Sequence, residues 1–197
     1  MRIVVVSAGM GVPSSTRILA DRLAAASVAA LHEPVEVDVV ELRPLAHALA
    51  DHLLTGFPSG DLAAAIETVR RADALIAVTP VFSASYSGLF KTFFDVLEPG
   101  LLEGMPVLVG ATAGTARHSL VLEHALRPLF SYLHAVVVPT GVFAASEDFG
   151  EAGLEARIQR AAGELAALLT GAPRQPARTV EDELADPTPF EDLLRGA

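Results

Sequence analysis

Short apolar runs alternate along this chain with segments of helical spacing, and this alternation limits the folds that it can adopt. The run at 3–6 is apolar at every position, which is typical of a parallel strand buried on both faces. The run at 35–41 alternates with polar residues, which favours an edge strand. Strands are expected at 3–6, 35–41, 74–78, 105–110 and 135–138, and helices at 16–31, 61–71, 118–133 and 153–169, with a further helix that follows a loop at 79–86 and ends near residue 97. The stretch 42–57 has no strong period and is expected to meander over the surface.

The order of these elements predicts an α/β fold. Strands and helices alternate, and the right-handed crossover rule then gives a parallel sheet with helices on both faces. We expect the flavodoxin-like version, a three-layer sandwich whose five-stranded sheet has the order 2-1-3-4-5. This domain should span residues 1–170. An acidic, proline-containing tail should follow at 171–197, where the stretch 180–197 holds six acidic residues against one arginine.

Charge and cysteine content exclude several classes of function. The net charge of -10 repels the phosphates of nucleic acids and of anionic lipids, so we expect neither nucleic-acid nor membrane binding. The absence of cysteine excludes disulfides, thiolate catalysis and cysteine metal sites. The six histidines lack metal-ligand spacing, and no apolar stretch reaches the ~20 residues of a membrane span. We therefore expect a cytoplasmic protein without a metal site.

The first candidate binding element is the loop at 7–15. In this type of sheet, ligands bind beyond the carboxyl ends of the strands where the strand order reverses, which selects the loops after the first, third and fourth strands. The first loop contains two glycines and leads into Ser14, Ser15 and Thr16 at a helix start, where free N–H groups and the helix dipole favour a phosphate. Its spacing fits neither a P-loop nor a dinucleotide fingerprint, whereas a mononucleotide such as FMN fits. The alternative is that the serines only cap the helix.

The other two loops are also compatible with a ligand. The loop at 79–88 combines a proline, two aromatic residues and several serines, which can present a stiff backbone edge and a flat apolar surface to a planar ring. Its aromatic residues, Phe82 and Tyr86, can equally point into the core. The loop at 111–115 consists of small residues that permit close backbone approach. Three such loops at the three crevice positions indicate a ligand-binding site more strongly than any one of them does.

Two longer stretches resemble the signatures of a known family. The sequence from 79 to 95, TPVFSASYSGLFKTFFD, resembles a signature of the NADPH-dependent FMN reductases of flavodoxin-like fold. The sequence from 112 to 129, TAGTARHSLVLEHALRPL, is similar to a second signature of that family, especially in its alkanesulfonate-type branch. The resemblance covers about residues 1–149 and is closest to the FMN reductases that accompany a luciferase-like flavin monooxygenase.

This resemblance implies roles for individual residues. The hydroxyl residues at the helix start would hold the flavin phosphate, while the second and third loops would line the isoalloxazine ring. The implied flavin-binding residues are Ser14, Ser15, Thr16, Pro80, Val81, Phe82, Ser83, Ser85, Ser87, Thr112, Ala113 and Gly114. His118 follows the third loop, where it can approach the nicotinamide or the flavin. Many relatives carry an arginine where this chain has Gly11, so phosphate neutralisation falls to the helix terminus and to Arg17, and exchangeable flavin binding is expected.

The resemblance also implies an activity. We expect hydride transfer from NADPH or NADH to N5 of FMN, with the reduced FMN passed to the monooxygenase, and this chemistry needs no acid–base dyad because the cofactor carries it. Two alternatives stay open: an FMN-containing quinone, azo-dye or metal reductase, and a flavodoxin-like electron carrier without enzymatic activity. The family further implies a homodimer or homotetramer. Four apolar residues suit either an interface or the core: Leu89, Phe90, Phe93 and Phe94.

Overall fold

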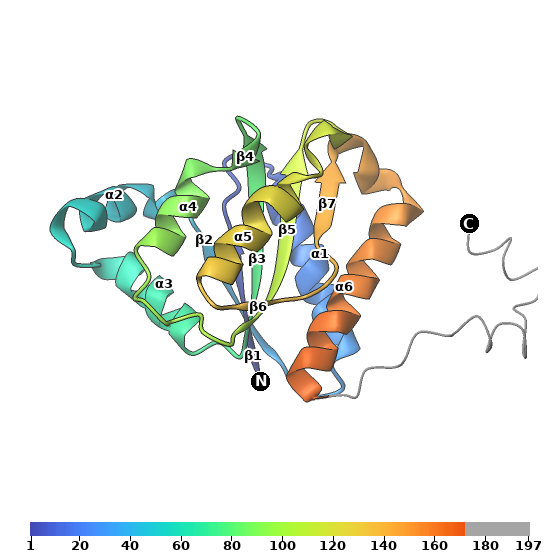
Figure 1. Ribbon diagram of the computed structural model, residues 1–197, viewed down its shortest axis with the longest axis horizontal. Helices are drawn as coiled ribbons and strands as arrows, with labels where there is room; N and C mark the ends of the chain where they lie inside the picture. The colour runs from blue at the N-terminus through green and yellow to red at the C-terminus, as the bar shows by residue number, and fades with distance from the viewer. Residues whose placement is uncertain (172–197) are drawn as a thin grey trace, which may run out of the picture.

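The computed structural model describes residues 1–171 and shows a parallel sheet with helices on both faces (Figure 1). The acidic tail expected from residue 171 onward therefore lies, apart from Gly171, outside the described residues. The strands are β1 (Arg2–Ser7), β2 (Glu36–Glu41), β3 (Ala74–Phe82), β4 (Ser85–Tyr86), β5 (Pro106–Ala113), β6 (Val136–Val137) and β7 (Val142–Ala145). The α-helices are α1 (Ser15–Ala30), α2 (Ala46–Thr55), α3 (Gly60–Arg70), α4 (Gly88–Asp95), α5 (Arg127–Tyr132) and α6 (Ala152–Thr170).

The sheet has the strand order that the sequence predicts. Its path runs β2-β1-β3-β5-β6, with β7 pairing parallel to β5 further along the same edge and β4 forming an antiparallel hairpin with β3. The main ladders are all parallel, and β2 lies at one edge, as its alternating sequence predicts. The flavodoxin-like order 2-1-3-4-5 is thus confirmed, with the fifth position shared by β6 and β7.

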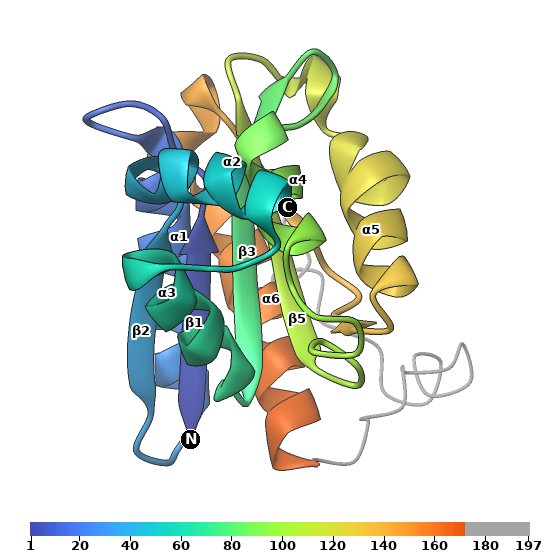
Figure 2. The same ribbon diagram turned by 90° about the vertical axis from the view of Figure 1, so that its left-hand side faces the viewer.

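Alternate residues of the central strands fill two separate cores. On β1, Ile3 and Val5 pack with α1 and α6, whereas Val4 and Val6 pack on the opposite face with α3, α4 and α5. Figures 1 and 2 show α1 and α6 side by side on one face of the sheet. This two-sided burial explains why the first strand is apolar at every position.

The phenylalanines of α4 belong to the core and not to an exposed face. Phe90, Phe93 and Phe94 are at most 2% exposed, and the rings of Phe94 and Phe130 meet edge to face with centroids 4.9 Å apart. Of the four residues considered for an interface, only Leu89 is partly exposed. The apolar face of α4 therefore packs against the sheet of its own chain and does not form an exposed interface.

The stretch 42–57 is helical, in contrast to the surface meander expected for it. A short 3-10 helix, Arg43–Leu45, leads into α2, and the helix ends at Gly56, whose φ of 77° is in the left-handed region. Leu42, Leu45 and Leu49 are buried at i, i+3 and i+7 spacing. Exposed apolar residues in the same stretch, among them Leu53, Leu54 and Phe57, obscure this period in the sequence.

The strands leading to the loops are longer than their apolar runs. β3 continues through Phe82 and β5 through Ala113, so much of the two predicted loops is strand. Conversely, the strand expected at 135–138 is reduced to the two residues of β6. Pro139 has no N–H to donate, and regular pairing resumes only at β7.

The helix expected at 118–133 is irregular. It consists of a 3-10 turn at Ala116–His118, a π-helical turn at Leu122–Leu126 and α5. Pro128 lacks the N–H that would continue the i to i−4 ladder at this point.

Across residues 1–171, no helix combines the length and the hydropathy that a membrane crossing requires. Nor do three or more His, Asp or Glu side chains in that range gather closely enough to hold a metal ion.

Candidate functional site

The carboxyl ends of β1, β3 and β5 lie next to each other in the sheet and bring the three predicted loops together. Ser7 is in register with Val78, and the N–H of Ala8 donates to the carbonyl of Val78 at 3.0 Å. On the other side of β3, Pro80 is in register with Thr112. These loops emerge at the upper edge of the molecule in Figure 1, close to β4.

A hydroxyl–hydroxyl hydrogen bond links the first loop to the third. Thr16 Oγ1 and Thr112 Oγ1 lie 2.8 Å apart, and both residues are buried. Thr16 is in the first turn of α1, and Thr112 is near the end of β5. The bond therefore fixes the start of α1 against the sheet.

A groove with a volume of about 290 Å³ opens above this bond. All three predicted loops contribute to it, and so does a fourth segment after β7. The lining residues are Met10, Gly11, Pro13, Ser14, Ser15, Thr16, Pro80, Val81, Phe82, Thr112, Ala113, Gly114 and Ser146. The structure thus brings together every residue implied for flavin binding except Ser83, Ser85 and Ser87.

The start of α1 offers several free hydrogen-bond donors to this groove. The N–H groups of Ser15 and Thr16 have no acceptor within residues 1–171. Ser14 is the N-cap, and its Oγ accepts from the N–H of Arg17 at 3.2 Å, so its own O–H proton stays available. Ser15 is exposed. Two N–H groups and two hydroxyls at the positive end of a helix form a cradle suited to a phosphate.

The first loop approaches α1 so closely that a glycine is required. A Cβ at Gly9 would lie 2.1 Å from Ser14 Oγ, and one at Gly11 would lie 2.9 Å from the carbonyl oxygen of Pro13. A side chain at Gly9 would therefore displace the hydroxyl of Ser14 from its capping position.

The β3–β4 hairpin separates the two aromatic residues of the second loop. Phe82 is 51% exposed and lines the groove, whereas Tyr86 packs against the core with its ring 5.9 Å from that of Phe90. At the hairpin tip, Ser83 and Ala84 have φ values of 49° and 68°. Such a turn normally contains Asn-Gly, and non-glycine residues pay about 1–2 kcal/mol each for the left-handed conformation.

The three serines of this segment lie outside the groove. Ser83 is exposed at the hairpin tip, and Ser85 faces a neighbouring hollow. Ser87 is buried and caps α4, since its Oγ accepts from the N–H of Phe90 at 3.2 Å. Its own N–H donates to Thr79 Oγ1 at 3.0 Å, which ties the base of the hairpin to α4.

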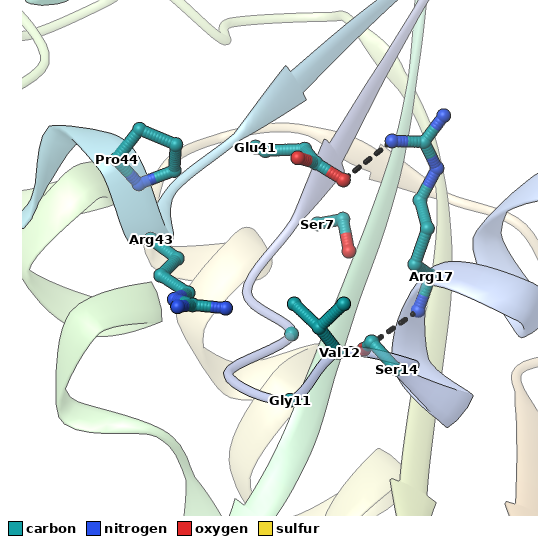
Figure 3. Close-up of a pocket in the computed structure, with 9 residues that line it drawn as sticks. Ser7, Gly11, Val12, Ser14, Arg17, Glu41, Arg43 and Pro44 are labelled. Atoms are coloured by element: carbon teal, nitrogen blue, oxygen red, sulfur yellow. Dashed lines mark hydrogen bonds and ion pairs between the residues drawn. The ribbon is translucent and has the colours of Figure 1, made fainter.

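Arg17 lies on the outer side of the first loop and not in the groove. It borders a second hollow of about 320 Å³, where its guanidinium is bound to Glu41 (Figure 3). The same guanidinium is also bound to Asp21 at 2.8 Å. The hydrogen bond to Asp21, with a smaller contribution from Glu41, raises the pKa of Arg17 above its ordinary value. Because two carboxylates largely compensate its charge, its effect on a phosphate in the groove is weak. Arg43 borders the same hollow and forms no ion pair within residues 1–171.

Sequence reasoning missed Ser146 and Arg43. Ser146 follows β7, and its place was hidden because the fifth strand was expected near residue 136. Arg43 lies in the stretch 42–57, which had no interpretable pattern. Both follow strands whose carboxyl ends face the crevice. Assigning the strand at 142–145 could have found Ser146, whereas Arg43 follows a strand that the sequence does predict, and its position after that strand was the available signal.

Comparisons with known proteins agree with this geometry. Residues 1–150 match the model of a family described as NADPH-dependent FMN reductase. The chain is 39% identical over 175 residues to an FMN reductase (NADPH) from Pseudomonas aeruginosa, covering 86% of this chain and 93% of that protein. It is 39% identical over 181 residues to the NADH-dependent FMN reductase SfnF from Pseudomonas fluorescens, covering 89% and 95%. The X-ray structure of an oxidoreductase from Corynebacterium diphtheriae superposes with a TM-score of 0.84 at 49% identity, covering 87% of this chain and 98% of that one.

Proposed function

The chain belongs to the NADPH-dependent FMN reductase family, and we propose that it transfers hydride from a nicotinamide nucleotide to FMN and supplies the reduced flavin to a flavin-dependent monooxygenase. The observation that carries this proposal is the groove in which the α1 N-terminus and three strand ends meet. Relatives named for NADPH and for NADH both support a nicotinamide nucleotide as the hydride donor.

The phosphate end of the flavin belongs at the start of α1. Ser14 and Ser15 donate their hydroxyl protons there, and the free N–H groups of Ser15 and Thr16 complete the cradle. Within the described part of the chain, no cationic side chain lines the groove, so neutral donors and the helix terminus bear the phosphate charge. FMN should therefore bind more weakly than it would in a site with a cationic side chain at the phosphate, which suits an enzyme that releases its flavin.

The ring end of the groove is formed by two strand ends. Pro80, Val81 and Phe82 line one side, and Thr112, Ala113 and Gly114 line the other. These residues orient the ring and shield one of its faces from water, while the bound flavin itself supplies the hydride-accepting chemistry. Because Thr112 is held by Thr16, the ring side and the phosphate side of the site keep a fixed separation.

The monooxygenase and the oligomeric state are part of the proposal. Resemblance to FMN reductases that accompany a luciferase-like monooxygenase supports the monooxygenase as the acceptor of reduced flavin, and a groove accessible from solvent permits release of the flavin.

We further propose a cytoplasmic homodimer or homotetramer. Large apolar side chains at the end of α2, Leu54 and Phe57, are 87% and 80% exposed and support burial in such an interface.

The test is to purify the protein, record its visible spectrum and follow the oxidation of NADH and NADPH with and without added FMN. We expect a rate that rises with FMN concentration and saturates. A rate independent of FMN would contradict the flavin-supplying role, and tightly bound flavin with a quinone acceptor would favour the reductase alternative. If neither NADH nor NADPH is oxidised, the alternative of a flavodoxin-like electron carrier is the one that remains. Riboflavin should bind much more weakly than FMN, because it lacks the phosphate.

A further inference from the structure

A hollow beside the groove has a basic lining. It has a volume of about 300 Å³ and lies between the β3–β4 hairpin and the π-helical turn. Its lining residues are Ala84, Ser85, Arg117, His118, Leu120, Val121, His124 and Ala125. Among residues 1–171, arginine and histidine are thus its only ionisable side chains, and no carboxylate of that range borders it. In a chain of net charge -10, such a hollow is a local site for an anion.

Arg117 is available for that anion. Its side chain is exposed and forms no ion pair or hydrogen bond within residues 1–171, in contrast to Arg17 and Arg127. The nearest carboxylate along the chain, Glu123, is bound to Arg127 at 2.7 Å. An arginine with a free guanidinium can bind a phosphate through two parallel hydrogen bonds.

The hollow adjoins the groove at two places. Phe82 lines the groove and Ser85 lines the hollow, and these residues are direct cross-strand partners in the β3–β4 hairpin, so their Cα atoms lie about 5 Å apart. Gly114 lines the groove and Arg117, three residues later, lines the hollow. A ligand stacked on the flavin ring can therefore extend past the hairpin into the hollow.

The flavin phosphate is not the anion that this hollow would bind. Its cradle is at the α1 N-terminus, on the first loop, whereas the hollow is bordered only by the hairpin and by residues after β5. The remaining phosphates belong to the nicotinamide nucleotide. NADPH differs from NADH only by a 2′-phosphate, a dianion that a basic hollow would favour.

We propose that this hollow binds the 2′-phosphate of NADPH, with Arg117 as the main contact and His118 and His124 beside it, and that it gives the enzyme a preference for NADPH over NADH. This inference rests on the proposed function, since it concerns the hydride donor of the same reaction. It assigns a specificity-determining role to Arg117, His118 and His124, which form no ion pair with a carboxylate within residues 1–171.

The test measures binding of adenosine 2′,5′-bisphosphate and of 5′-AMP by calorimetry, together with KM for NADPH and NADH at saturating FMN. The variants are Arg117→Ala and, as a matched loss of one exposed arginine, Arg160→Ala on α6, at the opposite face of the sheet. Loss of a charge-assisted contact should weaken the bisphosphate and raise KM for NADPH about 10- to 100-fold in Arg117→Ala. KM for NADH, binding of 5′-AMP and every value for Arg160→Ala should change less than about 2-fold.

Three results would overturn the inference. The first is equal binding of both nucleotides by the wild type, and the second is an Arg117→Ala variant that weakens NADH as much as NADPH. The third is a selective loss caused instead by Arg43→Ala, in the hollow behind the first loop. Each can occur while FMN-dependent oxidation of NADH persists, and then the proposed function stands without the inference. Failure of the wild type to oxidise either nucleotide with FMN counts against the proposed function, whereas the calorimetric comparison needs no flavin. Unchanged melting temperatures verify that the variants are folded.

Discussion

The hydroxyl groups of Thr16 and Thr112 meet at 2.8 Å beneath the groove, although the two residues are 96 positions apart in the chain. This bond joins the helix that presents the phosphate cradle to the strand that borders the ring side. In one orientation Thr16 donates, and in the other Thr112 does, so the second hydroxyl keeps a proton for another acceptor. The pair is structural in that it sets the distance between two parts of the site.

Replacing both threonines should cost less than the sum of the two single replacements. Thr16→Val or Thr112→Val leaves a buried hydroxyl without its partner and should lower the free energy of unfolding by about 1–2 kcal/mol. The double variant should lose less than the sum, because two apolar groups of similar shape can pack together. Urea unfolding of the four proteins provides the cycle, and strictly additive effects would show that the hydroxyls do not interact energetically.

Placing a negative charge at Ser15 should separate stability from flavin binding. Ser15→Asp puts a carboxylate in the first turn of α1, where it stabilises the helix by about 0.3–1 kcal/mol. The same charge repels a phosphate, so the dissociation constant for FMN should rise at least tenfold. Fluorescence titration measures the affinity and thermal unfolding measures the stability. Ser131→Asp, an exposed serine on α5, is the matched control, and an unaltered FMN affinity in Ser15→Asp contradicts the phosphate assignment.

A methyl group at Gly9 should disrupt the phosphate cradle. The added Cβ would lie 2.1 Å from Ser14 Oγ and force that hydroxyl away from the N–H of Arg17. Loss of this N-cap should cost about 0.5–2 kcal/mol, and FMN should bind more weakly. Gly163→Ala on α6, where nothing lies within 4 Å of the new Cβ, should instead stabilise by about 0.5–1 kcal/mol. Equal effects of the two substitutions would disprove the steric argument.

The hairpin tip should accept a more favourable turn sequence. Replacing Ser83-Ala84 by Asn-Gly relieves two residues with φ values of 49° and 68°, and we expect a gain of about 1–2 kcal/mol in the free energy of unfolding. Neither residue lines the groove, so the FMN affinity should stay the same. Circular dichroism melting and FMN titration provide the two measurements. A loss of stability would indicate that the native side chains make contacts outweighing the backbone strain.

Much of the fold was predictable because buried parallel strands leave a local pattern. The continuous apolar run at the start of the chain identifies β1, and the alternating run identifies β2 at the edge. The segment around α2 was not predictable, since exposed apolar residues such as Leu54 and Phe57 obscure the spacing of its buried leucines. The fifth strand position was predicted only in part, because the apolar run before Pro139 looks like a complete strand, whereas β5 pairs first with β6 and then, further along the same edge, with β7.

The candidate site was predictable to the extent that it follows from strand ends. Crevice loops are selected by topology alone, and the residues Ser14 to Thr16, Pro80 to Phe82 and Thr112 to Gly114 all line the groove. The positions of the serines around the hairpin could not be predicted, because they depend on where β3 ends, where the hairpin turns and where α4 begins. Ser87 faces away from the groove because it is the N-cap of α4.

By itself, the sequence determined the α/β class, the strand order, the three loops of the crevice and the family, because hydrophobic periodicity and contiguous signatures are local properties of the chain. The tertiary structure alone decided that Thr16 meets Thr112, that Arg17 is committed to Asp21 and Glu41, and that Arg117 shares a hollow with Ser85. Apart from the Arg17–Asp21 pair within α1, these relationships join residues far apart in the chain, and they depend on side-chain direction and helix register, which only the packed sheet specifies.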